Sequence, residues 1–189
     1  ESVSSFPSFV HIFQMFDCAP QPGQPMPLGK VLGAIGIGTL TTMIVQSSSA
    51  TIGLAIALAN SALLHFWTAV PIVLGDNIGT TITAILASLN ANRTARQTAA
   101  AHCMFNVFGT CIMVVLCYVP YRGVPCFLYL VNNVTTGNVF LGENIGRHVA
   151  MAHTLFNVTN VILMTPFIGA LAWLCEHLMP AKKVTTATV

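Results

Sequence analysis

The chain has 189 residues, of which 54% are hydrophobic and only 6% are charged, and its formal net charge is +2. A soluble domain carries about 25% charged residues, so this composition excludes a soluble protein and indicates an integral membrane protein. So small a charge excess gives no indication of nucleic-acid binding, and the lack of a long alternating pattern favours helices over a membrane β-barrel.

Residues 1–29 are predicted to form an N-terminal segment and a proline-rich linker. The apolar patch from Phe9 to Phe16 is too short to span a bilayer. Because the sequence starts at Glu1, with no charged n-region or cleavage site, we expect a fragment of a longer protein.

Polar residues interrupt the next apolar stretch, Lys30 to Asn60, in one block: Gln46, Ser47, Ser48 and Ser49. As a single helix this stretch would reach roughly 45 Å, well past a hydrocarbon core of about 30 Å. Folded back at the polar block, each limb reaches about the bilayer midplane, which predicts a re-entrant hairpin with the block near its tip. An amide and three hydroxyls there can replace the hydration shell of a small ion or oxyanion. In the alternative interpretation the serines bond to the preceding turn and only help helices to pack.

The apolar segment from Trp67 to Leu89 is also interrupted, by the sequence GDNIGTT at residues 75–81. Two glycines, an acid, an amide and two threonines predict a broken helix, whose freed N–H and carbonyl groups bind anions and cations. Asp76 is interpreted either as a sodium ligand or as the N-cap of the second half-helix.

The remaining elements alternate between loops and spans. We predict a polar loop over Asn90–Thr98, a plain spanning helix over Ala99–Val119, a partly interfacial connection over Pro120–Gly146, a last span over Arg147–Leu178 with a kink at Pro166, and a polar tail over residues 181–189. The arginines of the first loop and the lysines of the tail fall on one side, which the positive-inside rule makes cytoplasmic.

A short motif occurs twice: AHCMFNV at residues 101–107 returns as AHTLFNV at residues 152–158. The His and Asn of each copy, His102 with Asn106 and His153 with Asn157, are four residues apart on one helix face. We predict structural support, in which each histidine bonds to irregular backbone of the hairpin or the broken helix, ahead of direct ligation.

The six cysteines show no metal-ligand spacing and are predicted to be small buried hydrophobic residues, with a disulfide from Cys18 or Cys126 left open.

Four stretches, QSSSATIGLAIALA, PIVLGDNIGTTITAILASL, ARQTAAAHCMFNVFG and AHTLFN, resemble the sodium-dependent phosphate cotransporters, the type II Na/Pi family, and its bacterial branch most. The likeness covers roughly residues 30–180. Family members have two inverted repeats, each with a QSSS motif, so this chain resembles the C-terminal half of an inverted-repeat transporter. Asp76 departs from the family pattern, which has a small or uncharged residue there.

The resemblance implies a sodium-coupled phosphate symporter that is not an enzyme and needs no cofactor beyond the coupling ion. Its expected phosphate ligands are Gln46, Ser47, Ser48, Ser49, Asn77, Thr80 and Thr81. Its expected sodium ligands are Ser48, Ser49, Asp76, Asn77 and Thr80. Expected partners are the bilayer of the plasma or inner membrane, the missing N-terminal repeat or a second copy, and a homodimer mate.

Three other functions stay open at this point. One is an ion-channel or structural membrane module, and another is a sodium-coupled carrier of a different anion such as a dicarboxylate, although neither motif supplies an arginine clamp. The third is an intramembrane serine hydrolase that pairs Ser48 or Ser49 with His102 or His153.

Overall fold

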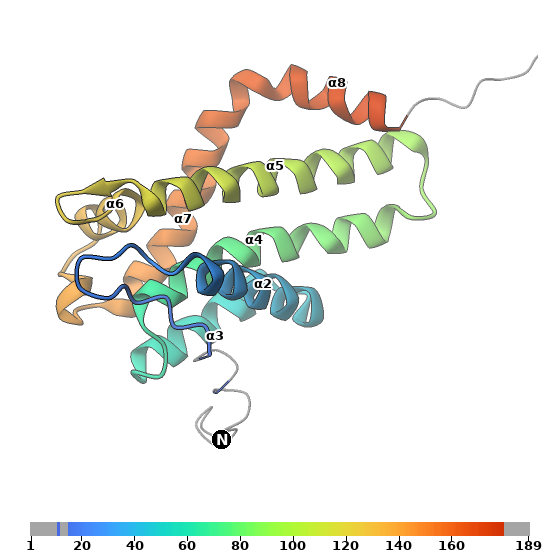
Figure 1. Ribbon diagram of the computed structural model, residues 1–189. Coiled ribbons are helices and arrows are strands. Elements are labelled where there is room, and N and C mark those ends of the chain that lie inside the picture. The colour runs from blue at the N-terminus through green and yellow to red at the C-terminus, as the bar shows by residue number, and fades with distance from the viewer. Residues whose placement is uncertain (1–10, 12–14, 180–189) are drawn as a thin grey trace, which may run out of the picture.

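The computed structural model describes residue 11 and residues 15–179, and this part of the chain is almost entirely helical (Figure 1). Its elements are α2 Leu28–Val45, α3 Ser48–Asn60, α4 Phe66–Ser88, α5 Arg93–Tyr118, β1 Pro120–Tyr121, β2 Val124–Pro125, α6 Cys126–Val134, η2 Val139–Leu141, α7 Ile145–Met164, η3 Thr165–Phe167 and α8 Ile168–Leu178. The predicted all-α fold class is confirmed. Most of the patch at Phe9–Phe16 and the whole tail at 181–189 lie outside the described residues.

The interruption predicted at the first polar block is confirmed as a helix–break–helix. Helix α2 ends at Val45 because Gln46 adopts a left-handed conformation, with φ 55° and ψ 28°, while its N–H still donates to Thr42 O at 2.7 Å. Ser47 is extended and caps α3, since its hydroxyl accepts a hydrogen bond of 3.3 Å from the N–H of Ala50.

The break predicted at residues 75–81 is wrong, because α4 continues from Phe66 to Ser88 without interruption. Polar side chains in this stretch bond to carbonyls of their own helix: Asn77 Nδ2 donates to Val73 O at 2.8 Å, and Thr80 Oγ1 donates to Asp76 O at 2.9 Å. They therefore need no unwound backbone. Asp76 lies in the helix interior, so its interpretation as an N-cap is also wrong.

The glycines of this stretch allow α2 and α4 to approach closely instead of breaking a helix. A Cβ atom on Gly75 would overlap the carbonyl oxygen of Ile35, and one on Gly38 would overlap that of Ile72. The hydroxyl of Thr39 also donates to Gly75 O at 3.0 Å across this contact. Small residues serve here to bring two membrane helices together.

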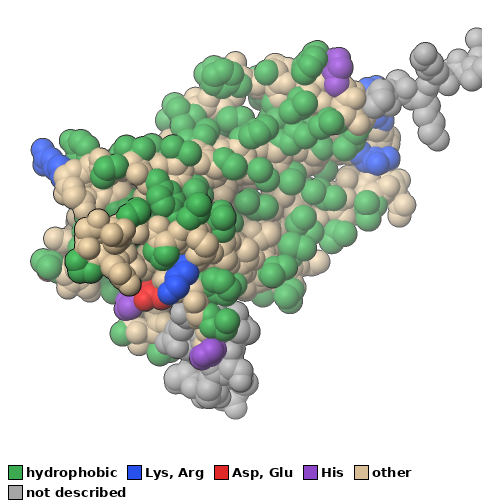
Figure 2. All heavy atoms as spheres, viewed as in Figure 1, with side chains coloured by type: hydrophobic (Ala, Val, Ile, Leu, Met, Phe, Trp, Pro, Cys, Tyr) green, Lys and Arg blue, Asp and Glu red, His purple; other side chains and the backbone are tan. Residues whose placement is uncertain are grey.

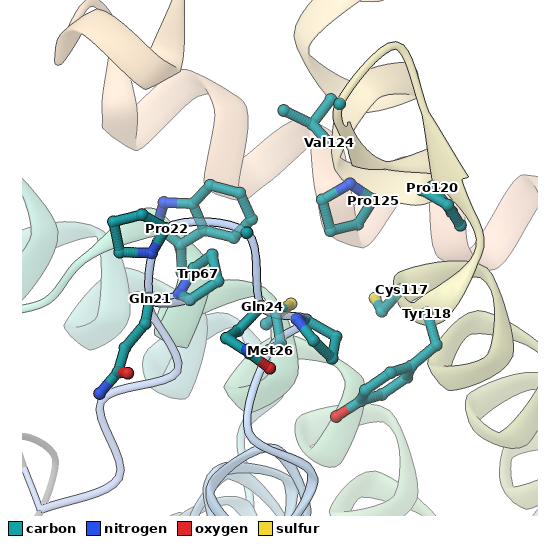
Figure 3. Close-up of a pocket in the computed structure, with 14 residues that line it drawn as sticks. Gln21, Pro22, Gln24, Met26, Trp67, Cys117, Tyr118, Pro120, Val124 and Pro125 are labelled. Atoms are coloured by element: carbon teal, nitrogen blue, oxygen red, sulfur yellow. The ribbon is translucent and has the colours of Figure 1, made fainter.

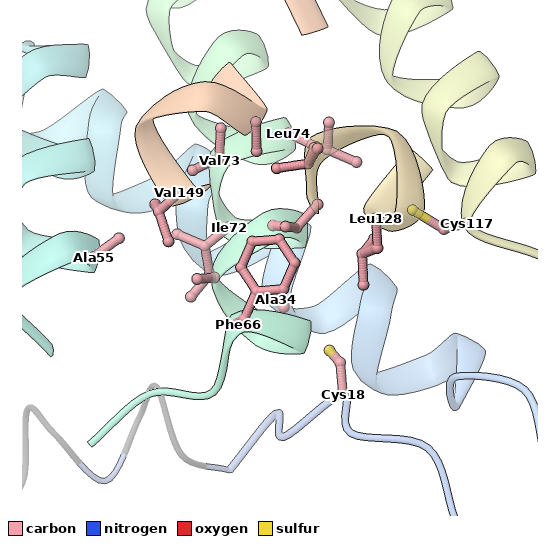
Figure 4. Packing of buried hydrophobic residues seen from close by; sticks show 14 of the residues in the cluster. Cys18, Ala34, Ala55, Phe66, Ile72, Val73, Leu74, Cys117, Leu128 and Val149 are labelled. Atoms are coloured by element: carbon pink, nitrogen blue, oxygen red, sulfur yellow. The ribbon is translucent and has the colours of Figure 1, made fainter. Parts of the chain in front are cut away.

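The start of α4 lies in the apolar core, where most of the other helices meet it. Figure 4 shows Phe66, Ile72 and Val73 of α4 among Leu128 of α6 and Val149 of α7. All five side chains are buried. This packing holds the helices around the middle of α4 in fixed positions.

Helix α5 begins earlier than predicted. Asn92 is its N-cap, because the Asn92 side chain accepts a hydrogen bond of 2.9 Å from the N–H of Ala95. Arg93 and Arg96 therefore lie in the first turns of α5, and the predicted loop over Asn90–Thr98 is wrong beyond Asn92.

The kink predicted at Pro166 is confirmed, and it divides the last span into two helices. Proline lacks the N–H that would continue the helix, and the turn η3 separates α7 from α8. Helix α8 then lies beside α5 (Figure 1), where Arg93 Nε donates to Met179 O at 2.6 Å. The broken span among the described residues is thus the last one, and not α4.

Four stretches are long and apolar enough to cross a membrane: Leu28–Val45, Phe66–Ser88, Arg93–Tyr118 and Ile145–Leu178. Large apolar side chains such as Ile44 and Ile162 face outward, and Figure 2 shows hydrophobic side chains over much of the visible face. Such a surface needs lipid around it. The protein is a multi-pass integral membrane protein.

Candidate functional site

The tip of the hairpin lies beside the middle of α4, and a cavity of about 280 Å³ opens between them. Helices α5 and α7 complete its wall. The residues that line it are Ser48, Asn77, Thr80, His102, Phe105, Asn106, His153 and Asn157. Residues from both polar motifs, the block at 46–49 and the segment at 75–81, thus meet residues from both copies of the AHxxFNV motif at one polar cavity.

Only part of the first polar block contributes to the lining of this cavity. The side chain of Ser48 lines it, and Ser47 lies next to it as the cap of α3. Gln46 and Ser49 are exposed at the tip and are not among the lining residues. The left-handed backbone of Gln46 is uncommon for a residue other than glycine and is often found at functional sites.

Helix α4 presents Asn77 and Thr80 to the cavity, one turn apart. Asn77 Oδ1 accepts a hydrogen bond of 3.2 Å from Asn157 Nδ2, which ties α4 to α7. Thr81, the other threonine predicted to bind substrate, is buried and donates to Ile78 O at 2.7 Å. The structure therefore brings Asn77 and Thr80 to the cavity and leaves Thr81 in the helix packing.

The repeated motif has a position that its sequence did not predict. His102 and Asn106 line the cavity from α5, and His153 and Asn157 line it from α7. The ring of His153 lies 3.1 Å from Asn157 Nδ2, so it contacts a side chain and not irregular backbone. The doubling of the motif was the signal that could have placed both copies at one site.

Asp76 lies behind the cavity, fully buried between α2 and α4. Its Oδ1 accepts a hydrogen bond of 2.7 Å from Thr42 Oγ1, which in turn lies 2.9 Å from Thr51 Oγ1. Within the described part of the chain Asp76 Oδ2 has no hydrogen-bond partner, and His153 Nε2 lies 3.9 Å from it. A buried carboxylate oxygen without a partner is unfavourable unless a cation or a donor reaches it.

The hydrolase alternative would need a serine in contact with a histidine base. Ser48 shares the cavity with His102 and His153. No hydrogen bond joins its hydroxyl to either imidazole among the residues that the structure describes.

A second cavity, of about 580 Å³, lies apart from the predicted site residues (Figure 3). The linker from Pro20 to Met26 encloses it together with Trp67, Tyr118 and the β1–β2 hairpin. None of the predicted ligands lines it, so it is not the candidate site.

All six cysteines are free thiols, and the disulfide left open for Cys18 or Cys126 is not present. Cys18 is fully buried beside the linker, and this burial raises the pKa of its thiol to about 12. The described residues contain no group of three or more His, Cys, Asp or Glu side chains that could hold a metal ion. The prediction of buried cysteines is confirmed for Cys18, Cys117 and Cys175 and is wrong for Cys111, which is exposed, while Cys103 and Cys126 are partly buried.

Residues 28–119 match the Na+/Pi-cotransporter family. The chain is 34% identical to the uncharacterized protein YqeW of Bacillus subtilis over 150 residues, which cover 79% of this chain and 44% of that protein. It is 39% identical over 108 residues to sodium-dependent phosphate transport protein 2B of Homo sapiens, covering 53% of this chain and 15% of that protein. The chain thus spans less than half the length of these relatives. No solved structure matches it.

Proposed function

Because this chain belongs to the Na+/Pi-cotransporter family, we propose that the full-length protein carries inorganic phosphate across the membrane together with sodium. In this proposal residues 30–180 are one transmembrane repeat of the carrier. Relatives named sodium-dependent phosphate transport proteins support it, as does the polar cavity between the hairpin and α4. The family is one of transporters, in keeping with a protein that is not an enzyme.

The observation that carries the proposal is the meeting of Ser48, Asn77 and Thr80 at one cavity inside an apolar bundle. Hydroxyl and amide groups donate hydrogen bonds to the oxygens of an anion. A water molecule occupies about 30 Å³ of liquid, so a cavity of about 280 Å³ accommodates a small anion with part of its hydration shell. We assign these three residues, with Ser47 at the same tip, to phosphate.

Sodium is assigned to Asp76 and to the oxygen atoms of Ser48, Asn77 and Thr80. The buried Oδ2 of Asp76 has no hydrogen-bond partner among the described residues, and a hard cation prefers oxygen ligands of this kind. A cation beside Asp76 would also offset the negative charge of phosphate in the adjacent cavity. Sodium binding would in this way prepare the site for the anion.

We assign Gln46 and Ser49 to a second part of the substrate site, whose opposite wall is not formed by this chain. Both are exposed at the hairpin tip, outside the described cavity. The chain spans 44% of the length of YqeW, which leaves room for a second repeat in the whole protein. We propose that a second repeat, or a second copy of this chain, faces Gln46 and Ser49 across the substrate.

Uptake of labelled phosphate by the full-length protein tests this function. Uptake is expected in sodium medium and not in choline medium, because an anion that enters a membrane site needs compensation of its charge. Equal uptake in the two media would refute sodium coupling. Uptake of a labelled dicarboxylate in place of phosphate would reassign the substrate.

A further inference from the structure

A third cavity, of about 400 Å³, lies between the last turns of α4 and the first turns of α5. Alanines form most of its wall, among them Ala84 and Ala87 of α4 and Ala95 and Ala99 of α5. Their short side chains leave space between the two helices. This cavity extends towards the α4–α5 loop, away from the hairpin tip.

His102 lines both this cavity and the substrate cavity. One turn before it, Ala99 lines only the cavity between α4 and α5. One turn after it, Phe105 and Asn106 line only the substrate cavity. The imidazole of His102 therefore stands where the two spaces meet.

The two repeated histidines are held differently. The ring of His153 lies 3.1 Å from Asn157 Nδ2 and 3.9 Å from Asp76 Oδ2, and it is partly buried. His102 is exposed, and in the described residues no hydrogen bond holds its ring. An exposed side chain of this kind changes rotamer on the picosecond to nanosecond timescale.

The wall of the alanine-lined cavity offers few hydrogen bonds to a passing solute. Its two hydroxyl groups are already used within their own helices: Ser88 Oγ donates to Ile85 O at 2.8 Å, and Thr98 Oγ1 donates to Thr94 O at 3.0 Å. A hydrated ion would thus move along this wall without binding to it. Arg96 follows the lining residue Ala95 in α5 and is exposed. Its positive charge lies near the loop end of the cavity and raises the local concentration of anions there.

We propose that His102 is the gate of a passage that joins the substrate cavity to the membrane face at the α4–α5 loop. The nature of the solute, a hydrated phosphate, rests on the proposed function. The passage itself rests on the position of His102 between two cavities. Rotation of the imidazole opens or closes the connection, while the fixed His153 stays in the wall of the site.

Cysteine accessibility in the full-length protein tests the gate. All native cysteines of the full-length protein, the six of this chain among them, are replaced by alanine, and one reporter cysteine is introduced: Ala95→Cys on the loop side of His102, or Phe105→Cys on the site side. A membrane-impermeant methanethiosulfonate that bears a sulfonate is then applied to each membrane face in turn. We expect both reporters to react from the same face.

Substitution of the gate then separates the two reporters. His102→Trp should lower the modification rate of Phe105→Cys at least tenfold and leave that of Ala95→Cys unchanged. His102→Ala, which adds no bulk, should raise the rate of Phe105→Cys. Val115→Trp serves as the matched control, because Val115 is an exposed residue of the same helix that lines neither cavity.

Equal rates at Phe105→Cys with His, Trp and Ala at position 102 would overturn the gate. So would an Ala95→Cys that reacts from neither face, because lipid or another part of the protein would then fill the cavity. The readout does not depend on transport. If His102→Trp closes access while the full-length protein with His102 intact shows no sodium-driven phosphate uptake, the gate is retained and the proposed function is refuted.

Discussion

The hydroxyl of Thr42 donates a hydrogen bond of 2.7 Å to Asp76 Oδ1, and this bond joins the end of α2 to the middle of α4. The second oxygen of this carboxylate, Oδ2, lies 3.9 Å from Nε2 of His153. The position of this acid inside an intact helix leaves a cation, and not a helix terminus, as its partner in our proposal. Its role can be measured directly.

Asp76→Asn is expected to raise the sodium concentration at half-maximal phosphate uptake about tenfold, which corresponds to roughly 1.4 kcal/mol. Asparagine retains an oxygen that can accept from Thr42, so the fold should persist while the charge is lost. Sodium titration of uptake by the full-length protein measures the shift. An unchanged sodium midpoint would remove Asp76 from the ion site.

Thr80→Val should reduce phosphate uptake by about 5- to 150-fold, since the loss of a partner for a buried polar group costs roughly 1–3 kcal/mol. Thr83→Val is the matched control, because Thr83 lies three residues further along α4 and does not line the cavity. Initial rates of uptake, normalised to the amount of protein in the membrane, compare the two. A similar loss in both variants would indicate a general effect on α4.

Gly38→Ala is expected to destabilise the fold by about 1–3 kcal/mol, because its Cβ would overlap the carbonyl oxygen of Ile72 and force α2 and α4 apart. Gly36→Ala, in the same helix, meets nothing within 4 Å and should leave the stability unchanged or slightly raise it. Thermal unfolding of the detergent-purified protein measures both. Equal melting temperatures for the two variants would contradict the close packing of α2 on α4.

The thiol of Cys18 should resist alkylation at pH 8. Burial raises its pKa to about 12, so only about one molecule in ten thousand carries the reactive thiolate at that pH. Peptide mass spectrometry after treatment with N-ethylmaleimide reports modification at this residue. The same protein unfolded in guanidinium is the control and should react fully, and rapid labelling of the folded protein would contradict the burial of Cys18.

Local properties of the sequence were enough to predict the membrane class, a break within the polar block Gln46–Ser49, which the structure places at Gln46 and Ser47, and the kink at Pro166. The grounds were the length of the run Lys30–Asn60 compared with the bilayer, the polar block in its middle and the missing N–H of proline, and each is a property of one stretch of chain. These features therefore need no knowledge of neighbouring helices.

The fate of residues 75–81 depended on what packs against them. Glycines can unwind a helix or allow a second helix to approach closely. Threonine hydroxyls can bond to unwound backbone or to carbonyls of their own helix. The sequence is the same in both cases. The carbonyl oxygens of Ile35 and Thr39 in α2 lie where side chains at Gly75 and Gly79 would be, and α4 stays intact.

The composition of the candidate site was decided in the same way. The sequence supplied Ser48, Asn77 and Thr80 as candidates, and the doubled motif supplied His102 and His153. Only the packing of α5 and α7 against α4 brought these residues to one cavity, and it left Gln46, Ser49 and Thr81 outside. Residue chemistry is a local property of the chain, whereas the direction in which a side chain points across a bundle is set by contacts between helices far apart in sequence.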